Sequence, residues 1–559
     1  MHDSWISYLI VLGVSLAICL NAQIVYAQST ELTSHDNHAL LYAHQLQFSS
    51  SGTPMVRIRI ADNMETLRFK PKGHFRVYPS GKGGCAIDLP GNQNYEISFD
   101  QVTSGKYQYA SILARSENVT EIEKLKNQCL EHQVDVEVLP IGSLFALHGK
   151  VFDNRENLLI TKRSQQQSEQ LISLQSCGTF ASSEIEPVPN EPYSELLAYP
   201  EAGLTIRDSS KKIQIHHRNL MWIELSDEGA VFYDIPGENG KTSDILINSM
   251  VVVTPDKNGK MAVVQSADVE TILRGIVPGE IFASAPESAL MAQTIAARTT
   301  LIAQVGNRHQ ADPYHLCNHQ HCQVYLGLSG ADPRTDKAIE KTRGQILFYG
   351  KKTVQGYYSS HCGGFSAGRN ETWGLPDQPY LQALSDNEHE KAHHFNSDEA
   401  FLAWWQTKPD EDYCGNAPKG KTSFSSTKYA RWMTHVHSGE LNSLIHKAGY
   451  DVGKVTRIEV SERGPSFRAI QLKISGTKGE ILVDRELSIR KLLNLKSALF
   501  VLKVNKANDE ISSIDIYGAG FGHGVGLCQT GAIGMAQRGK SVSDILNHYF
   551  PGTHIETLW

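Results

Sequence analysis

The chain has 559 residues and a formal net charge of −7, with 53 basic and 60 acidic side chains. Its hydrophobic content of 40% and charged content of 20% are typical of a folded protein and exclude an intrinsically disordered chain. No run of Lys and Arg forms a basic stripe, so we expect no nucleic-acid partner. At about 150 residues per domain, the length predicts about three to four domains.

The first 27 residues have the pattern of a secretory signal peptide. An apolar run from Ile6 to Leu20 is followed by Val25-Tyr26-Ala27, and polar chain begins at Gln28. We therefore predict cleavage after Ala27 and export to the periplasm, the cell envelope or the extracellular space. The alternative is a short uncleaved anchor, in which case this segment alone would contact a membrane. The chain has nine cysteines, and loss of Cys19 with the signal peptide would leave eight.

Residues 41–163 form a predicted N-terminal β-rich region. Residues 55–60 and 75–78 alternate between apolar and polar types, which predicts strands. Residues 107–139 then predict a β-α-β unit, whose helix at 120–132 carries Ile122, Leu125 and Cys129 at helical spacing. This unit could bind glycan or serve as a spacer.

Residues 164–192 are rich in Gln, Ser, Glu and Pro, which predicts a linker. A second β-rich segment, 193–265, is expected to pack on the catalytic unit that follows at 266–559. The predicted fold class is therefore α+β and multidomain, with β-rich modules before an α+β catalytic domain.

Two short helices are predicted on either side of residue 280. The first begins at a Ser266 cap and ends at Gly275, and the second begins at the capping box of residues 284–287 and runs to about residue 304. Glu280 is thus expected in a tight turn that contains Pro278 and Gly279. A carboxyl group in an apolar loop would be partly desolvated, which favours a general acid; the alternative is a solvent-exposed loop residue.

Arg298 lies in the middle of the second predicted helix. An arginine at such a position commonly lies on the surface in an ion pair. It could instead orient or stabilise a carboxylate.

Several long motifs of residues 266–559 resemble the sporulation stage II protein D / amidase-enhancer (SpoIID/LytB) family. They occur in the family's order, and residues 28 to about 190 lie outside the resemblance. The motifs are Leu273–Ile281, Glu287–Arg298, His321–Tyr325, Tyr358–Gly364, Trp373-Gly374, Pro379–Leu381, Gly518–Gln529, Gly531–Ala536 and Tyr549–Gly552.

The resemblance implies a peptidoglycan lytic transglycosylase that cuts MurNAc–GlcNAc glycan strands and forms 1,6-anhydro-MurNAc. It implies that Glu280 is the catalytic acid and base, and that Arg298 binds substrate or positions Glu280. One carboxyl group suffices, because the C6 hydroxyl of the same sugar, rather than water, attacks C1. The alternative within the family is a non-catalytic peptidoglycan-binding enhancer of a partner cell-wall amidase.

Further substrate contacts are expected in two of the motifs. Tyr357 and Tyr358 could stack on a sugar, or at least one of them could belong to the core. The hydroxyls of Ser359 and Ser360 could hydrogen-bond sugar hydroxyls. His523 lies among alternating glycines that let the backbone approach a ligand closely, and Gln529 begins a predicted helix.

A cluster of His and Cys residues between 309 and 322 raises the question of a metal. Some family members resemble this segment and carry a structural zinc there, so His309, Cys317, His321 and Cys322 are the expected ligands, with His315 as a substitute. The alternatives are a disulfide between Cys317 and Cys322 or plain thiols. A site with four protein ligands leaves no open position, which would exclude zinc-dependent hydrolysis, and no organic cofactor is expected.

The remaining Cys and His residues have no assignment from the sequence. His361 and Cys362 are neighbours whose side chains would point to opposite faces of a strand, which argues against a catalytic pair. The sequence indicates no pairings for four scattered cysteines, Cys85, Cys129, Cys177 and Cys414. His389, His393 and His394 are expected in an exposed loop.

Overall fold

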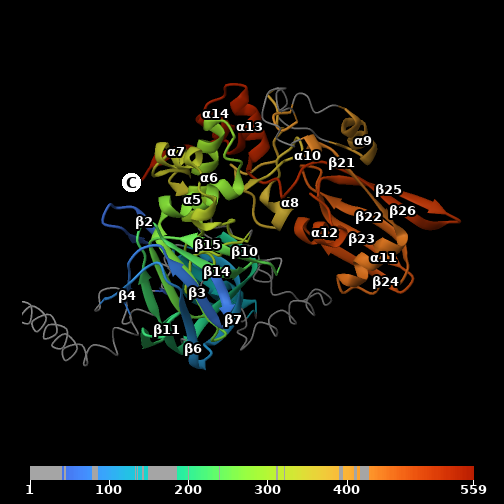
Figure 1. The fold of residues 1–559 in the computed structure, drawn as a ribbon. Helices are drawn as coiled ribbons and strands as arrows, with labels where there is room; N and C mark the ends of the chain where they lie inside the picture. The colour runs from blue at the N-terminus through green and yellow to red at the C-terminus, as the bar shows by residue number, and fades with distance from the viewer. Residues whose placement is uncertain are drawn as a thin grey trace, which may run out of the picture. The chain divides into compact units, whose positions relative to one another are not determined.

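The computed structural model shows a β-rich chain with several short helices (Figure 1). It describes residues 41–42, 46–78, 86–116, 118–132, 134, 136–141, 144–148, 186–198, 200–237, 240–309, 312–319, 321–388, 395–407, 412–415 and 427–559. These form two compact units: unit 1 is Met1–Gly275 with Gln304–Gly330, and unit 2 is Ile276–Ala303 with Ala331–Trp559. The predicted α+β, multidomain, β-rich fold class is confirmed. The predicted signal peptide, residues 1–27, and residues 389–394 lie outside the described residues.

Unit 1 contains two large antiparallel sheets. The seven-stranded sheet has the order β1 (Gln47–Phe48), β2 (Pro54–Met64), β17 (Met261–Asp268), β16 (Met250–Pro255), β13 (Met221–Glu224), β4 (Phe75–Tyr78), β5 (Ile87–Leu89). The six-stranded sheet has the order β12 (Gln214–Arg218), β11 (Glu201–Asp208), β6 (Tyr95–Thr103), β3 (Thr66–Pro71), β14 (Ala230–Pro236), β15 (Thr242–Ile247).

Buried aromatic rings join the two sheets. Phe75 of β4 contacts Phe69 of β3 and Tyr95 of β6, with ring centroids 5.8 and 4.9 Å apart. Phe69 also stacks on Phe232 of β14 at 5.3 Å. Side chains that alternate along each strand thus meet in one core, as they do where sheets pack face to face.

The structure does not separate the regions 41–163 and 193–265, which the sequence divided into two domains. Strands from both regions alternate within each sheet; β2 pairs with β17, and β3 with β14. Periodicity locates strands but carries no information on which distant strands pair, so the division at the predicted linker was wrong.

A third sheet of unit 1 has the order β10 (Glu186–Ala198), β7 (Lys106–Ser116), β9 (Leu144–His148), β8 (Glu137–Ile141). Helix α3 (Val119–Glu131) follows β7 and buries Ile122, Leu125 and Cys129, which confirms the predicted stripe. Residues 186–192 of the predicted linker belong to β10 instead. This strand lies at the edge of its sheet and pairs on one side only. An edge strand tolerates proline, which has no N–H to donate, better than a central strand does.

Helix α5 (Val269–Glu280) begins and ends later than the sequence predicts. Asp268, not Ser266, accepts the Thr271 N–H at 3.1 Å, and Ser266 belongs to β17. Gly275 does not end the helix, because its role is close packing: a Cβ there would lie 2.4 Å from the Tyr325 ring. The helix therefore continues past Pro278.

Helix α6 (Glu287–Gln304) belongs to unit 2 except for its last residue, Gln304. The 3₁₀ helix η2 (Gly327–Gly330) belongs to unit 1. The other helices of unit 2 are α7 (Pro333–Lys341), α8 (Arg369–Trp373), α9 (Asp398–Gln406), α10 (Thr427–Ala430), α11 (Ser438–Lys447), α12 (Glu486–Leu493), α13 (Gln529–Gln537) and α14 (Val542–Tyr549). Its sheets are β19 (Lys352–Thr353)-β18 (Gln345–Tyr349)-β28 (His554–Thr557), β20 (Tyr358–Ser359)-β27 (Leu527–Cys528), β21 (Trp432–His437)-β26 (Glu510–Gly518)-β25 (Phe500–Ala507) and β22 (Val455–Arg463)-β23 (Ala469–Gly476)-β24 (Gly479–Asp484).

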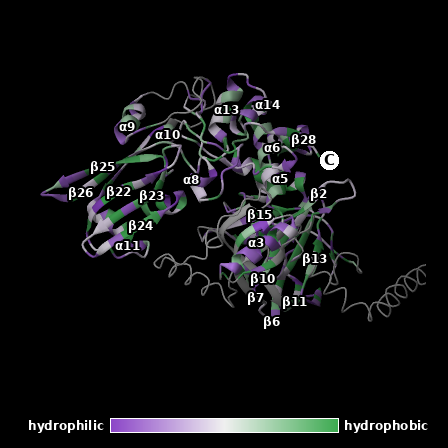
Figure 2. Cartoon of the chain, turned by 180° about the vertical axis from the view of Figure 1, so that it is seen from behind, coloured by the Kyte–Doolittle hydropathy of each residue, from purple (hydrophilic) through white to green (hydrophobic). Residues whose placement is uncertain are grey.

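The two three-stranded sheets between residues 432 and 518 share one hydrophobic core with α11 and α12. Hydrophobic and hydrophilic residues alternate along these strands (Figure 2). The core includes Leu441 of α11, Ile489 of α12, Leu472 of β23 and Ile514 of β26. Within the described ranges, no helix is both long and apolar enough to cross a membrane.

Candidate functional site

Glu280 is the last residue of α5 and is partly exposed. The hydroxyl of Tyr358, the first residue of β20, donates a hydrogen bond to its carboxyl group. Burial and the Glu280 charge together raise the pKa of Tyr358 well above its ordinary value of 10, so the phenol keeps its proton. The structure thus joins two residues that the sequence predicted separately, although Glu280 ends a helix rather than lying in a turn.

The strand that carries Tyr358 is held by a short parallel pairing. Tyr358 and Ser359 of β20 lie opposite Leu527 and Cys528 of β27. Immediately after β20, the Ser360 carbonyl accepts hydrogen bonds from the Thr530 N–H and hydroxyl, at 3.1 and 2.8 Å. Two motifs far apart in the sequence are therefore fixed against each other beside Glu280.

Three predicted substrate-binding residues lie in or next to the paired strands β20 and β27, and they differ in exposure. Ser360 is partly exposed, whereas Ser359 is 6% and Gln529 is 8% exposed. The Ser359 Oγ and the Gln529 Nε2 have no hydrogen-bond partner among the residues that the structure describes. Ser360 is therefore the better placed of the two serines for a direct contact, and all three assignments stay predictions.

His523 lies in the glycine-rich loop of residues 518–526 and connects this loop to β20. Its Nδ1 accepts the Val525 N–H at 3.0 Å, and its ring also hydrogen-bonds to the Tyr358 backbone. Burial and the positive charges of Arg490 and Arg468 lower the pKa of His523 to about 3, so the ring is neutral. This arrangement positions Tyr358.

Arg298 is fully buried, in the middle of α6. Its guanidinium donates to the carbonyl of Ile339 at 3.4 Å, and to the Thr342 hydroxyl and the Gln345 carbonyl at 3.3 and 3.2 Å. These contacts hold the end of α7 against α6, where a positive charge also complements the helix dipole. The observed contacts are structural, and its role toward substrate stays a prediction.

Two aromatic residues, Trp373 and Phe282, were not among the predicted site residues, although Trp373 lies in one of the motifs. The Trp373 ring lies between those of His523 and Tyr357, with centroid distances of 5.1 and 4.8 Å. Phe282, two residues after Glu280, is 65% exposed. Neither position has a polarity pattern that distinguishes it from core residues.

The four predicted metal ligands come together in unit 1. The ligand atoms of His309, Cys317, His321 and Cys322 all lie within 4.8 Å of one another. The His309 Nε2 lies 3.3 Å from the Cys322 Sγ, and the His321 Nδ1 lies 3.7 and 3.5 Å from the sulfurs of Cys317 and Cys322. Bonds of about 2.0–2.3 Å in a tetrahedron separate ligand atoms by about 3.3–3.8 Å, so the residues fit zinc. Cys317 and Cys322 are free thiols, not a disulfide.

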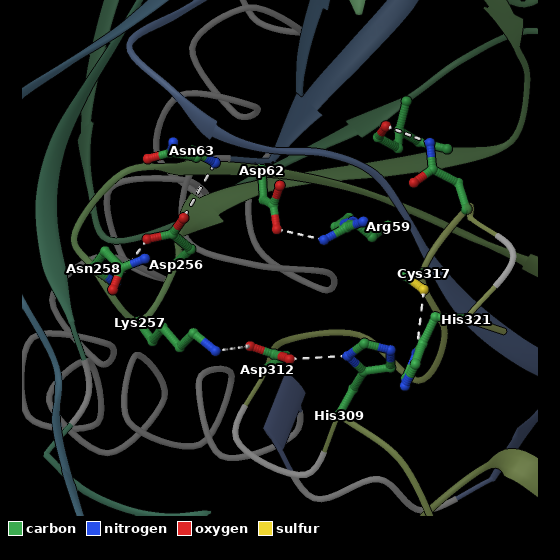
Figure 3. Close-up of polar contacts among 12 residues, drawn as sticks. Arg59, Asp62, Asn63, Asp256, Lys257, Asn258, His309, Asp312, Cys317 and His321 are labelled. Carbon is green, nitrogen blue, oxygen red and sulfur yellow. Dashed lines mark hydrogen bonds and ion pairs between the residues drawn. The ribbon is translucent and has the colours of Figure 1, made fainter. Parts of the chain in front are cut away.

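Asp312 orients one of these ligands, and the sequence did not single it out (Figure 3). Its carboxylate lies 3.0 Å from the His309 Nδ1 and 3.8 Å from the Lys257 ammonium group. A carboxylate behind a ligating imidazole is a common support of metal sites. The proposed substitute, His315, is fully buried and its Nδ1 accepts the Arg57 N–H at 3.2 Å, so it is not part of the four.

Comparisons with known family models match two regions of the chain. Residues 257–349 match the family model described as stage II sporulation protein, SpoIID. Residues 367–526 match a domain of unknown function, DUF8618.

Three relatives match about half of the chain. An uncharacterized protein of Brachyspira hyodysenteriae is 26% identical over 299 residues, 53% of this chain and 69% of that protein. The amidase enhancer of Bacillus subtilis is 27% identical over 304 residues, 50% of this chain and only 40% of the relative. The stage II sporulation protein D of Bacillus amyloliquefaciens is 28% identical over 309 residues, 52% of this chain and 75% of the relative. The chain therefore contains a region similar to the SpoIID family, which confirms the resemblance that its motifs indicate.

Proposed function

We propose that this protein acts on peptidoglycan as an exported lytic transglycosylase, with Glu280 as the general acid and base. The proposal rests on the hydrogen bond from Tyr358 to Glu280, a residue within the region that matches the SpoIID family model. A hydrogen bond from a protonated phenol restricts the orientation of the Glu280 carboxyl group, which is partly exposed and so remains within reach of a ligand.

The proposed reaction needs one carboxyl group. Protonated Glu280 gives its proton to the glycosidic oxygen, the bond to C1 breaks, and positive charge develops on the MurNAc ring. The Glu280 carboxylate then takes the proton of the C6 hydroxyl, whose oxygen closes the 1,6-anhydro ring on C1. Tyr358 keeps the carboxyl group in place through both steps, and the exposed ring of Phe282 offers a surface for a sugar.

His309, Cys317, His321 and Cys322 would hold a structural zinc ion in this proposal. Four protein ligands leave no open position, so the ion would stabilise the segment 309–322 and supply no Lewis-acid chemistry.

The name of one relative, amidase enhancer, favours a second candidate function. In it, the chain would bind glycan and stimulate a partner amidase without cutting glycan itself. Glu280 would then be dispensable for that stimulation.

The test compares wild-type protein with Glu280→Gln and a matched control, Glu287→Gln. Glu287 lies at the start of α6, is half-exposed and forms an ion pair with Lys341 at 2.7 Å. With glycan strands stripped of peptides, mass spectrometry should find 1,6-anhydro products for wild type and the control. Glu280→Gln should lower their rate about 10²–10⁴-fold. Absence of such products with wild type would reject catalysis, and undiminished stimulation of an amidase by Glu280→Gln would favour the second function.

A further inference from the structure

A second group of metal-ligating side chains lies in unit 2, which the sequence did not reveal. The sulfurs of Cys362, Cys414 and Cys528 and a carboxylate oxygen of Asp386 all lie within 4.8 Å of one another. All four residues are at most 1% exposed. They come from four separate segments: the turn after β20, the loops at 386 and 414, and the end of β27.

The geometry of the group resembles a ligand shell. The sulfurs of Cys362 and Cys414 lie 3.6 Å apart, too far for a disulfide and close to the about 3.8 Å expected for two thiolates on one tetrahedral zinc ion. All three cysteines are free thiols.

Groups around the four residues hold their side chains by hydrogen bonds, as the neighbours of metal ligands commonly do. The Tyr549 hydroxyl donates to one oxygen of Asp386 at 2.6 Å, and the Cys414 N–H donates to the other at 2.7 Å. The Cys528 sulfur accepts the N–H groups of Cys362 and Gly531, at 3.1 and 3.3 Å. Cys528 is also the N-cap of α13, whose dipole favours a thiolate there.

The charge balance also favours a bound cation. As metal ligands, three thiolates and a carboxylate would bring four negative charges into one buried site, and burial of unpaired negative charge is costly. The Arg468 guanidinium donates to the Cys362 carbonyl at 2.7 Å and its charge interacts with Cys362 and Cys528. A divalent ion would balance most of the remaining negative charge. Thiolate ligands select Zn²⁺ over Mg²⁺ or Ca²⁺, which prefer oxygen.

We propose that Cys362, Asp386, Cys414 and Cys528 bind one structural Zn²⁺ ion. With four protein ligands it would be a closed site. It would join the end of β20 to the end of β27, and so brace the strand that carries Tyr358. The proposal is independent of what the protein does to glycan.

The experiment measures zinc per chain by mass spectrometry and sulfur ligands per zinc by X-ray absorption, on the full chain purified with reductant and zinc. Wild type should hold two ions, with an average of about 2.5 sulfurs each. The variant His309→Ala/Cys322→Ser should keep one ion bound by three sulfurs. Cys362→Ser/Cys528→Ser should lose that ion, whereas Asp412→Asn, a buried carboxylate outside the group, should keep it.

Wild-type measurements alone decide the question if a variant fails to fold. One ion per chain with three sulfurs supports the site, whereas one ion with two sulfurs, or no zinc, overturns it. A disulfide between Cys362 and Cys414, found by peptide mapping of protein isolated without reductant, would also overturn it.

Discussion

The hydroxyl of Tyr358 hydrogen-bonds to the carboxyl group of Glu280, and the Tyr358 backbone in turn hydrogen-bonds to His523. A helix end, a two-residue strand and a glycine-rich loop are thus connected through one tyrosine. The orientation of the proposed acid depends on a residue whose own position is fixed from both sides.

Tyr358→Phe should lower the rate of glycan cleavage about 10–100-fold, because a hydrogen bond to a charged group contributes about 1.5–3 kcal/mol. Binding of glycan should change little. Initial rates with stripped glycan strands, measured for this variant and for Tyr450→Phe at an exposed site, check the prediction. Equal rates for Tyr358→Phe and wild type would show that the hydroxyl does not position Glu280.

The buried neutral His523 predicts a loss of stability in acid. Its pKa is about 3 in the folded chain and about 6.5 when unfolded, so below pH 6.5 the unfolded state binds the extra proton. Stability should therefore fall as the pH drops from 6.5 toward 3, by up to about 2 kcal/mol between pH 7 and 5 from this residue. Denaturant titrations at pH 7 and 5 should show a smaller loss for His523→Gln than for wild type. An identical loss in both proteins would contradict the neutral imidazole.

Gly526→Ala should destabilise the chain by about 3 kcal/mol. The residue has φ +72°, and a Cβ would lie 2.1 Å from the Tyr357 carbonyl oxygen. Gly539→Ala is the matched control, because Gly539 has φ +80° and nothing within 4 Å of an added Cβ. It should cost only about 1 kcal/mol, the strain of a positive φ. Thermal melts of both variants separate the steric clash from backbone strain, and equal losses would argue against the clash.

Asp312→Asn should weaken zinc binding at the His309 site about 10–100-fold, since a carboxylate behind a ligating histidine fixes its ring and raises its basicity. Competition with a chromophoric chelator measures this affinity. Asp227→Asn, an exposed residue of the same unit, should leave it unchanged. An unaltered affinity in Asp312→Asn would exclude Asp312 as a support of the site.

Local patterns predicted some features of the molecule accurately. The stripe on α3 followed from helical spacing. The cluster of His and Cys residues at 309–322 is visible in the sequence, and the family resemblance selected the four whose ligand atoms the structure brings together. The resemblance to a family directed attention to Glu280 and Tyr358. It carried no information on their hydrogen bond.

Other features depend on contacts between distant segments. Cys414 has no distinctive neighbours in sequence, and only the fold brings it to Cys362 and Cys528. Gly275 has the local pattern of a helix end, yet close packing against Tyr325 explains it. Pro187 and Pro192 suggested a linker, whereas an edge strand tolerates them because it pairs on one side only.

The chain crosses between the two units three times, after residues 275, 303 and 330. During synthesis, unit 1 cannot be completed when its sheets emerge from the ribosome, because Gln304–Gly330 are made only after the first segment of unit 2. A truncated protein that ends at residue 275 would therefore lack all four residues of the His309 site. For recombinant work, the two units cannot be obtained by cutting the gene once.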